Sequence, residues 1–497
     1  MPSRERSISR RTVAAATAGG ALLALSAAPA TAGPDRATPA AATPEASPQA
    51  ATVPAPTTAE VLPAYQDLSD AIRSRGQSLI DPLLAGNGEP ARAALSDELR
   101  KTLSGVDLAA VVAGLQANQI RFSFSEVHAH WAGTVGPGTI SGFFQQAGVR
   151  DTFTLTPKDS GATPSASPAM AASPVPEPYP AGVWSGTLDA LKLPFEISFS
   201  GDAASPAATI TIAEQGITGV PLDDVAFLPE APFGAVTYER AIPLAPATHL
   251  YGQVREWAGG QVQIDLSLSG DAIAAIQFQP AIVLPEDPAA GFVSDLTYRL
   301  PWERGAWFVF WGGDTEVQNY HAVAPSQRHA YDILVWKDGA TFAGDGSQND
   351  HYWIWGQPLV APIAGTVVEA LNDQPDQVPG QPLSETDPGA FTTLHPAGNH
   401  IILQASDKEF VVIAHMQRGS VRVQKGDVLK PGDPIGLVGN SGNTSEPHLH
   451  IHVQNVADFS DPKAVSLPLV FSGLTVDGKP ASGGELLQGT FAEPADD

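Results

Sequence analysis

The first part of the chain shows helical spacing of its apolar residues, followed by alternation of apolar and polar residues. Apolar side chains recur every three or four residues in 61–84 and 91–113, which predicts two helices. Alternation in 120–127 and 139–155 predicts strands, in which successive side chains point to opposite faces. Helices followed by strands are typical of α+β folds, so we expect a small α+β module over residues 58–160.

A different pattern, of short apolar runs separated by Gly and Pro, extends over residues 181–300 and predicts a β-rich middle module. Residues 161–180, rich in Pro, Ser and Ala, separate the two modules, and a similar Ala-, Pro- and Thr-rich stretch, residues 33–57, precedes the first. Neither stretch has enough large apolar side chains to bury a core. We expect both to be linkers, and residues 33–57 to be disordered.

Beyond residue 300 the apolar runs stay short and are bounded by Gly, Pro, Asn and Asp. This pattern predicts an all-β domain over residues 301–475 without a long helix, followed by a C-terminal tail, residues 476–497. The predicted strands of the domain are residues 330–336, 358–361, 365–370, 400–404, 410–416, 433–438 and 448–453.

The last of these strands carries the most specific pattern in the chain. His448, His450 and His452 alternate with Leu449 and Ile451, so the three imidazoles should share one face while the apolar side chains pack on the other. Nine of the twelve histidines of the chain lie in the predicted all-β domain. This clustering favours a metal site over a solvated strand face.

Two other predicted strands of this domain each hold one polar residue among apolar neighbours, Asp332 and His415. A buried carboxylate is costly unless it is paired or bound to a metal ion. With His448 and His450, these residues could supply the three protein ligands of a catalytic zinc site and leave one position open for water. Zinc lowers the pKa of that water, and further histidines nearby can take its proton. We therefore expect a Zn²⁺ centre.

Composition narrows the classes of partner. Acidic residues outnumber basic ones by 53 to 27, and the net charge of −26 argues against nucleic acid as a partner. The chain has no cysteine, so a metal must be held by His, Asp or Glu. Residues 1–32 have the basic start, apolar run and small-residue cleavage site of an export signal. We expect no stable membrane anchor after its removal, and a secreted or cell-wall-associated protein.

The route of export has two interpretations. The segment Ser9-Arg10-Arg11-Thr12-Val13 resembles a twin-arginine signal, but the match after the arginine pair is partial. Ordinary secretion therefore remains the alternative.

A set of motifs occurs in a fixed order over residues 310–455. They are Asp332 after an upstream histidine, then residues 358–368, 398–402, 412–416, 425–428 and 432–442, and finally Pro447-His448-Leu449-His450. Together they resemble the lysostaphin-type zinc endopeptidases that cut peptidoglycan cross-links. The resemblance implies a metallopeptidase-like domain whose open groove admits peptidoglycan peptides. It also implies that Asp332 and His450 bind zinc, and that His415 and His448 are catalytic.

The chain departs from the family pattern at the first metal ligand. The family places a histidine four residues before the aspartate, where this chain has Arg328. His321 and His329 are the two candidates. His329 lies three residues before Asp332 and would face the other side of a regular strand, so we favour His321. The remaining histidines of the domain are expected to be structural or to line the groove: His351, His395, His400 and His452.

Three hypotheses for the function follow. The first is a secreted zinc-dependent endopeptidase that hydrolyses peptide bonds in bacterial peptidoglycan through a metal-activated water. The second, kept open by Arg328, is a catalytically degenerate member of the family that binds peptidoglycan or regulates another wall hydrolase. The third is a non-enzymatic wall-binding protein in which the upstream modules carry the function.

Overall fold

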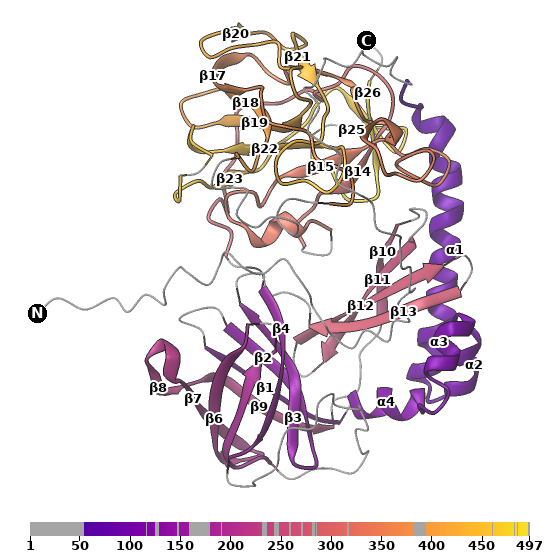
Figure 1. Ribbon diagram of the computed structural model, residues 1–497, viewed down its shortest axis with the longest axis vertical. Helices are drawn as coiled ribbons and strands as arrows, with labels where there is room; N and C mark the ends of the chain where they lie inside the picture. Colours follow the sequence, from indigo (N-terminus) through magenta and orange to yellow (C-terminus); the bar gives the residue numbers. More distant parts are fainter. Residues whose placement is uncertain are drawn as a thin grey trace, which may run out of the picture. The chain divides into compact units, whose positions relative to one another are not determined.

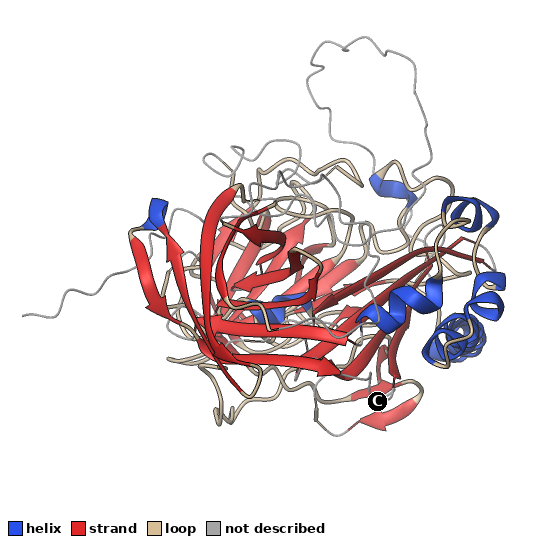
Figure 2. Ribbon diagram, turned by 90° about the horizontal axis from the view of Figure 1, so that it is seen from below, coloured by secondary structure: helices blue, strands red, loops and turns tan. Residues whose placement is uncertain are grey.

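The computed structural model describes residues 54–495 with several gaps. The gaps are residues 116, 125–128, 147–148, 159–178, 190, 231–235, 243–247, 258–259, 270–271, 281–283, 285, 316–317, 382–393, 460, 482 and 485. The predicted export signal, nearly all of the first predicted linker and most of the second lie outside the described residues. Strands dominate the described part of the chain, and helices are few (Figure 2).

The described residues form two compact units. Residues 69–242 and 248–285 make the N-terminal unit, and residues 54–68 and 286–495 make the C-terminal unit. None of the described helices combines the length and the apolar character of a membrane-spanning segment.

Four helices open the described chain. They are α1 (Thr58–Leu84), α2 (Gly88–Ala93), α3 (Asp97–Thr102) and α4 (Leu108–Leu115). The prediction of a helix over 61–84 is confirmed, but the segment 91–113 forms parts of three short helices. The reason is local, because the Ser96 side chain accepts a hydrogen bond from the Leu99 amide and so starts a new helix at Asp97.

A nine-stranded antiparallel sheet follows, in the order β8-β7-β6-β5-β4-β3-β2-β1-β9. Figure 1 labels most of its strands. Its strands are β1 (Ala117–Phe124), β2 (Ala129–Gly136), β3 (Thr139–Gln146), β4 (Val149–Pro157), β5 (Gly182–Leu188), β6 (Leu193–Asp202), β7 (Ser205–Ile212), β8 (Ile217–Pro221) and β9 (Asp223–Glu230). Strands β4 and β5 are hydrogen-bonded neighbours. The predicted boundary between the two upstream modules, residues 161–180, therefore lies between adjacent strands of one sheet.

The N-terminal unit also holds a four-stranded antiparallel sheet in the order β10-β11-β12-β13. Its strands are β10 (Val236–Ile242), β11 (Thr248–Trp257), β12 (Gly260–Ser269) and β13 (Ala272–Pro280). Leu266, Leu268 and Ile273 of this sheet are buried against the helices. The helices thus pack on strands far along the chain from them.

The C-terminal unit is built on an eleven-stranded sheet in the order β20-β17-β18-β19-β22-β15-β14-β26-β24-β25, with β23 paired to β22. Its strands are β14 (Trp307–Trp311), β15 (Tyr331–Leu334), β17 (Gly365–Leu371), β18 (Asn399–Gln404), β19 (Phe410–Met416), β20 (Val428–Leu429), β22 (Leu449–Gln454), β23 (Ser466–Leu467), β24 (Leu474–Val476), β25 (Lys479–Ala481) and β26 (Phe491–Pro494). A separate pair joins β16 (Pro358–Val360) to β21 (Pro434–Leu437). The β-rich character predicted for this part of the chain is confirmed, and residues 476–497, expected to be a tail, contain two strands of the sheet.

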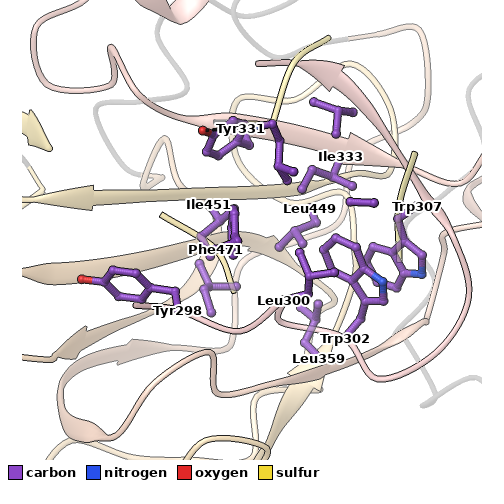
Figure 3. Packing of buried hydrophobic residues seen from close by; sticks show 14 of the residues in the cluster. Tyr298, Leu300, Trp302, Trp307, Tyr331, Ile333, Leu359, Leu449, Ile451 and Phe471 are labelled. Atoms are coloured by element: carbon purple, nitrogen blue, oxygen red, sulfur yellow. Dashed lines mark hydrogen bonds between the residues drawn. The ribbon is translucent and has the colours of Figure 1, made fainter. Parts of the chain in front are cut away.

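A large apolar core packs against this sheet, and Figure 3 shows part of it. Leu449 and Ile451 are fully buried in it, as the alternation in the last predicted strand indicated. Trp302 and Trp307 stack with their ring centroids 4.5 Å apart. Trp302, Trp307 and Phe308 are all buried in this core.

The first three turns of α1 belong to the core of the C-terminal unit. Val61 and Tyr65 are buried there, and the Tyr65 ring lies 5.3 to 5.5 Å from the rings of Phe308, Trp336 and Phe491. The Thr58 hydroxyl donates a hydrogen bond of 2.8 Å to the Glu493 carboxylate. The sequence predicted this helix from its spacing but assigned all of it to the first module, because spacing does not identify the partner of an apolar face.

We expect Tyr65→Ala to lower the free energy of unfolding of the C-terminal unit by about 3–5 kcal/mol, the usual cost of removing a buried aromatic ring. The matched control is Leu68→Ala on the same helix, where the side chain is 42% exposed and should contribute little. Denaturant unfolding followed by tryptophan fluorescence measures both. Equal effects from the two variants would contradict the role given to Tyr65.

Candidate metal centre

Three adjacent strands, β19, β22 and β15, bring the candidate residues together. Asp332 on β15 lies directly opposite His450 on β22, and Ala414 on β19 lies opposite His450 on the other side. His415 follows Ala414, and His448 immediately precedes β22. Residues separated by more than a hundred positions in sequence thus become neighbours through strand register.

Asp332, His321 and His450 form one compact group, and His415, His448 and His450 form a second that shares His450. The Nδ1 atom of His450 lies 2.8 Å from Oδ1 of Asp332, and Nε2 of His321 lies 3.6 Å from Oδ2 of the same carboxylate. Asp332, His321 and His450 are each at least 95% buried as whole residues. One ligand atom from each lies within 4.8 Å of the others. Ligands about 2.0–2.2 Å from one zinc ion lie roughly 3.4 Å apart, so this group fits such an ion.

His321 is held in a fixed orientation by Asn319. It lies in the 3₁₀ helix η4 (Tyr320–Val323), and its Nδ1 donates a 2.9 Å hydrogen bond to Oδ1 of Asn319. The amide of Asn319 in turn donates to the carbonyl of Ala330, 2.9 Å away, which fixes its oxygen as the acceptor. The Nε2 lone pair of His321 therefore faces Asp332, and this buried nitrogen has no hydrogen-bond partner. Such an orientation by an outer residue is characteristic of metal-binding histidines.

His329 lies elsewhere. Its Nε2 is 3.2 Å from Oδ2 of Asp287, and its backbone amide donates to the hydroxyl of Ser466. Of the two candidates for the first ligand, the structure brings His321 to Asp332. The 3₁₀ helix that places it there could not be read from strand periodicity.

His415 and His448 flank this group and share one mode of anchoring. Nδ1 of His415 donates to the carbonyl of Ser441, and Nδ1 of His448 donates to the carbonyl of Glu446, each over 2.8 Å. Both rings therefore turn Nε2 inward. Nε2 of His448 lies 3.5 Å from Oδ1 of Asp332, and the centroids of the two rings are 4.7 Å apart. His415 has a left-handed backbone, with φ of 57°, a strained conformation often found at functional sites.

Burial and charge shift the pKa values of these groups in different directions. Burial would raise the pKa of Asp332, but the nearby imidazoles of His321 and His448 hold it well below its ordinary value. Burial lowers the pKa of His321 to about 3 and that of His415 well below its usual range. Burial would also lower the pKa of His448, but the charge of Asp332 raises it above the ordinary value. His448 is therefore the stronger base of the flanking pair.

The structure also gathers Glu369, His395 and His400 within 4.8 Å. Nε2 of His400 lies 3.2 Å from the Glu369 carboxylate, which is 44% exposed on its side chain. Nδ1 of His395 accepts a hydrogen bond from the Ala397 amide, so its other nitrogen carries the proton in the neutral ring and has no lone pair for a metal. This cluster is a weaker candidate for a metal site.

The residues that sequence reasoning missed are the hydrogen-bond partners of the candidate ligands. Asn319 orients His321, and His452 lies behind His450, with Nδ1 of His452 2.9 Å from Nε2 of His450. His452 was expected to be structural or to line the groove. The alternation of histidines indicated that His452 lies on the same strand face as His450. It did not indicate that the two rings form a hydrogen bond.

A buried carboxylate with imidazoles converging on one face of a sheet is the arrangement of a metallopeptidase-type hydrolase. Comparison with known families agrees, because residues 354–462 match the model of Peptidase family M23. This part of the chain belongs to that family, and the resemblance to the lysostaphin-type peptidases is confirmed for it. The matched residues include His415, His448 and His450, whereas His321 and Asp332 precede them.

Individual relatives cover only parts of the chain. Endolysin 2638A of Staphylococcus phage 2638A is 34% identical over 109 residues, which are 21% of this chain and 20% of the endolysin. The match thus spans about a fifth of the endolysin's length.

Two solved structures that resemble parts of the chain also have low sequence identity to it. The catalytic domain of lysostaphin from Staphylococcus simulans is 22% identical, with 28% of this chain and 73% of that one covered and a TM-score of 0.17. A zinc-containing peptidase from Vibrio cholerae is 15% identical, with 55% and 86% covered and a TM-score of 0.20. TM-scores this low do not establish a common fold, so the family assignment depends on the sequence match.

Proposed function

We propose that the C-terminal domain is a zinc-dependent endopeptidase that hydrolyses peptide bonds in bacterial peptidoglycan. The observation that carries this proposal is the buried group of His321, Asp332 and His450, in which an imidazole nitrogen without a hydrogen-bond partner faces a carboxylate. A buried polar atom of this kind is costly unless a ligand satisfies it. A divalent cation between these side chains would do so.

His321, Asp332 and His450 would be the metal ligands. Two neutral imidazoles and one carboxylate form a ligand set that would suit zinc, and His415 and His448 lie beside this set. When bound, zinc lowers the pKa of a water molecule and polarises the scissile carbonyl group.

His448 and His415 would bind the attacking water by hydrogen bonds. Each keeps an inward-facing Nε2 because its Nδ1–H is bonded to a backbone carbonyl, so each can accept a hydrogen bond from water. We assign the proton of the attacking water to His448, because its Nε2 lies 3.5 Å from an oxygen of the proposed ligand Asp332. Once protonated, it can stabilise the developing oxyanion or pass the proton to the leaving amine.

The substrate and the location are inferred from the family. Peptidase family M23 and the phage endolysin both suggest peptides of the bacterial wall as the substrate. An extended peptide would enter an open groove above the metal centre. Action on peptidoglycan requires export, for which residues 1–32 supply the predicted signal.

The proposal predicts that purified protein contains a single zinc ion per chain and releases peptides from purified peptidoglycan. A chelator should abolish the zinc content and the release of peptides. Added zinc should restore both properties, because the ligands are held in place by the fold. His400→Ala serves as the control, since it alters the second histidine cluster and should keep the zinc content. Protein that binds peptidoglycan, contains no zinc and cleaves nothing would instead support a catalytically degenerate relative.

A further inference from the structure

A chain of hydrogen bonds extends from the metal centre along the polar face of β22. Nε2 of His450 lies 2.9 Å from Nδ1 of His452, and Nε2 of His452 lies 3.1 Å from Oε1 of Gln454. The amide nitrogen of Gln454 then donates to the carbonyl of Val456 over 2.8 Å. His452 is fully buried and Gln454 is 1% exposed, so water does not compete for these bonds.

The carbonyl group of Val456, at the end of this series of hydrogen bonds, fixes which nitrogen of each ring carries a proton. A backbone carbonyl only accepts, so Gln454 must present its NH₂ to Val456 and its oxygen to His452. His452 therefore carries its proton on Nε2 and offers a lone pair on Nδ1. The ring is fully buried, and neither of its hydrogen-bond partners, His450 and Gln454, is a carboxylate, so the ring is neutral. His450 must then donate from Nε2, which leaves the lone pair on its Nδ1.

The Nδ1 lone pair of His450 faces an oxygen of Asp332 only 2.8 Å away. Two electron-pair donors this close need a cation or a proton between them. We propose that His452 and Gln454 are positioning residues that fix the tautomer of His450, so that Nδ1 is its metal-binding atom. This inference rests on the proposed zinc centre and extends it to residues that do not touch the metal.

Packing alone does not account for a histidine at position 452. Its neighbour across the strands is Val412, and the ring of Phe459 lies 6.1 Å away, so its surroundings are mostly apolar. A buried imidazole in such a place is costly unless both nitrogens are bonded, and its two partners are His450 and Gln454. An aliphatic side chain would satisfy packing but would leave the Nε2–H of His450 without an acceptor.

The test compares two substitutions of similar size, His452→Asn and His452→Leu. Asn keeps an acceptor near the position of Nδ1, whereas Leu removes it. The zinc dissociation constant, measured by competition with a chromophoric chelator, should rise roughly 10–100-fold for His452→Leu, as for other lost outer-shell partners, and stay near the wild-type value for His452→Asn. Long-range ¹H–¹⁵N spectra of the zinc-loaded wild type should show His450 protonated at Nε2.

Several outcomes would overturn the inference. They are a folded His452→Leu variant with wild-type zinc affinity, equal losses in both variants, or a His450 protonated at Nδ1. His400→Leu, which removes another fully buried imidazole, should leave affinity unchanged and controls for packing. If His452→Leu does not fold, Gln454→Leu tests the same series of hydrogen bonds and should also weaken zinc binding. Absence of zinc binding by the wild type would refute the zinc centre itself.

Discussion

Replacement of Asp332 by asparagine is expected to eliminate zinc binding at the proposed metal centre while the protein stays folded. Asp332 is the only anionic member of the proposed ligand set, and three imidazole nitrogens lie within 3.6 Å of its oxygens. Asparagine keeps the shape but removes the charge that offsets that of the cation. The loss of affinity should exceed the roughly 10–100-fold that removal of an outer-shell partner costs. Metal content by mass spectrometry and chelator competition measure it.

Asp376→Asn is the matched control for this substitution. That carboxylate accepts hydrogen bonds from the backbone amides of Arg418 and Asn440, away from the ligand set, so its loss should leave zinc bound. Stoichiometric zinc in the Asp332→Asn protein would contradict the ligand assignment. Loss of zinc in both variants would indicate a general effect of removing carboxylates.

Replacement of His448 by alanine is expected to separate zinc binding from hydrolysis. His448 is anchored by the carbonyl of Glu446 and turns its Nε2 toward Asp332 at 3.5 Å, but it is not one of the proposed ligands. Zinc should therefore remain, while kcat/KM for peptidoglycan hydrolysis should fall about 10²–10⁴-fold, the usual contribution of a general base. Zinc analysis and release of amino groups from purified peptidoglycan give the two values on one preparation.

His351→Ala provides the comparison, because His351 pairs with the exposed carboxylate of Asp345 and plays no part in the proposed chemistry. Both its zinc content and its activity should match the wild type. Full activity of His448→Ala would end the assignment of this residue as the base. Loss of zinc from His448→Ala would make it a ligand instead.

The sequence was most informative about features that depend on one strand alone, such as which of its side chains are buried. Alternation of His448, His450 and His452 with Leu449 and Ile451 correctly placed the apolar pair in the core. The alternation follows from backbone geometry and needs no knowledge of neighbouring strands. In the same way, the turn residues of the C-terminal part predicted short strands, which the structure has.

The sequence could not predict which strands pair with each other or which side chains meet in the folded protein. The pairing of β4 with β5 across residues 161–180 depends on contacts between strands, and local composition suggested a boundary there instead. His321 reaches the centre through a short 3₁₀ helix and the side chain of Asn319, neither of which has a periodic signal. Only the family resemblance, together with the awkward position of His329, pointed to His321.

The discontinuous make-up of the C-terminal unit has a consequence for how the protein is made. Residues 54–68 leave the ribosome long before the strands that enclose Val61 and Tyr65 have been synthesised. Until the last strands emerge, these two side chains have no core to enter, and the nascent chain displays them to solvent or to chaperones. The C-terminal unit is thus completed only after β26 has been synthesised, and it includes a segment that is made before the N-terminal unit.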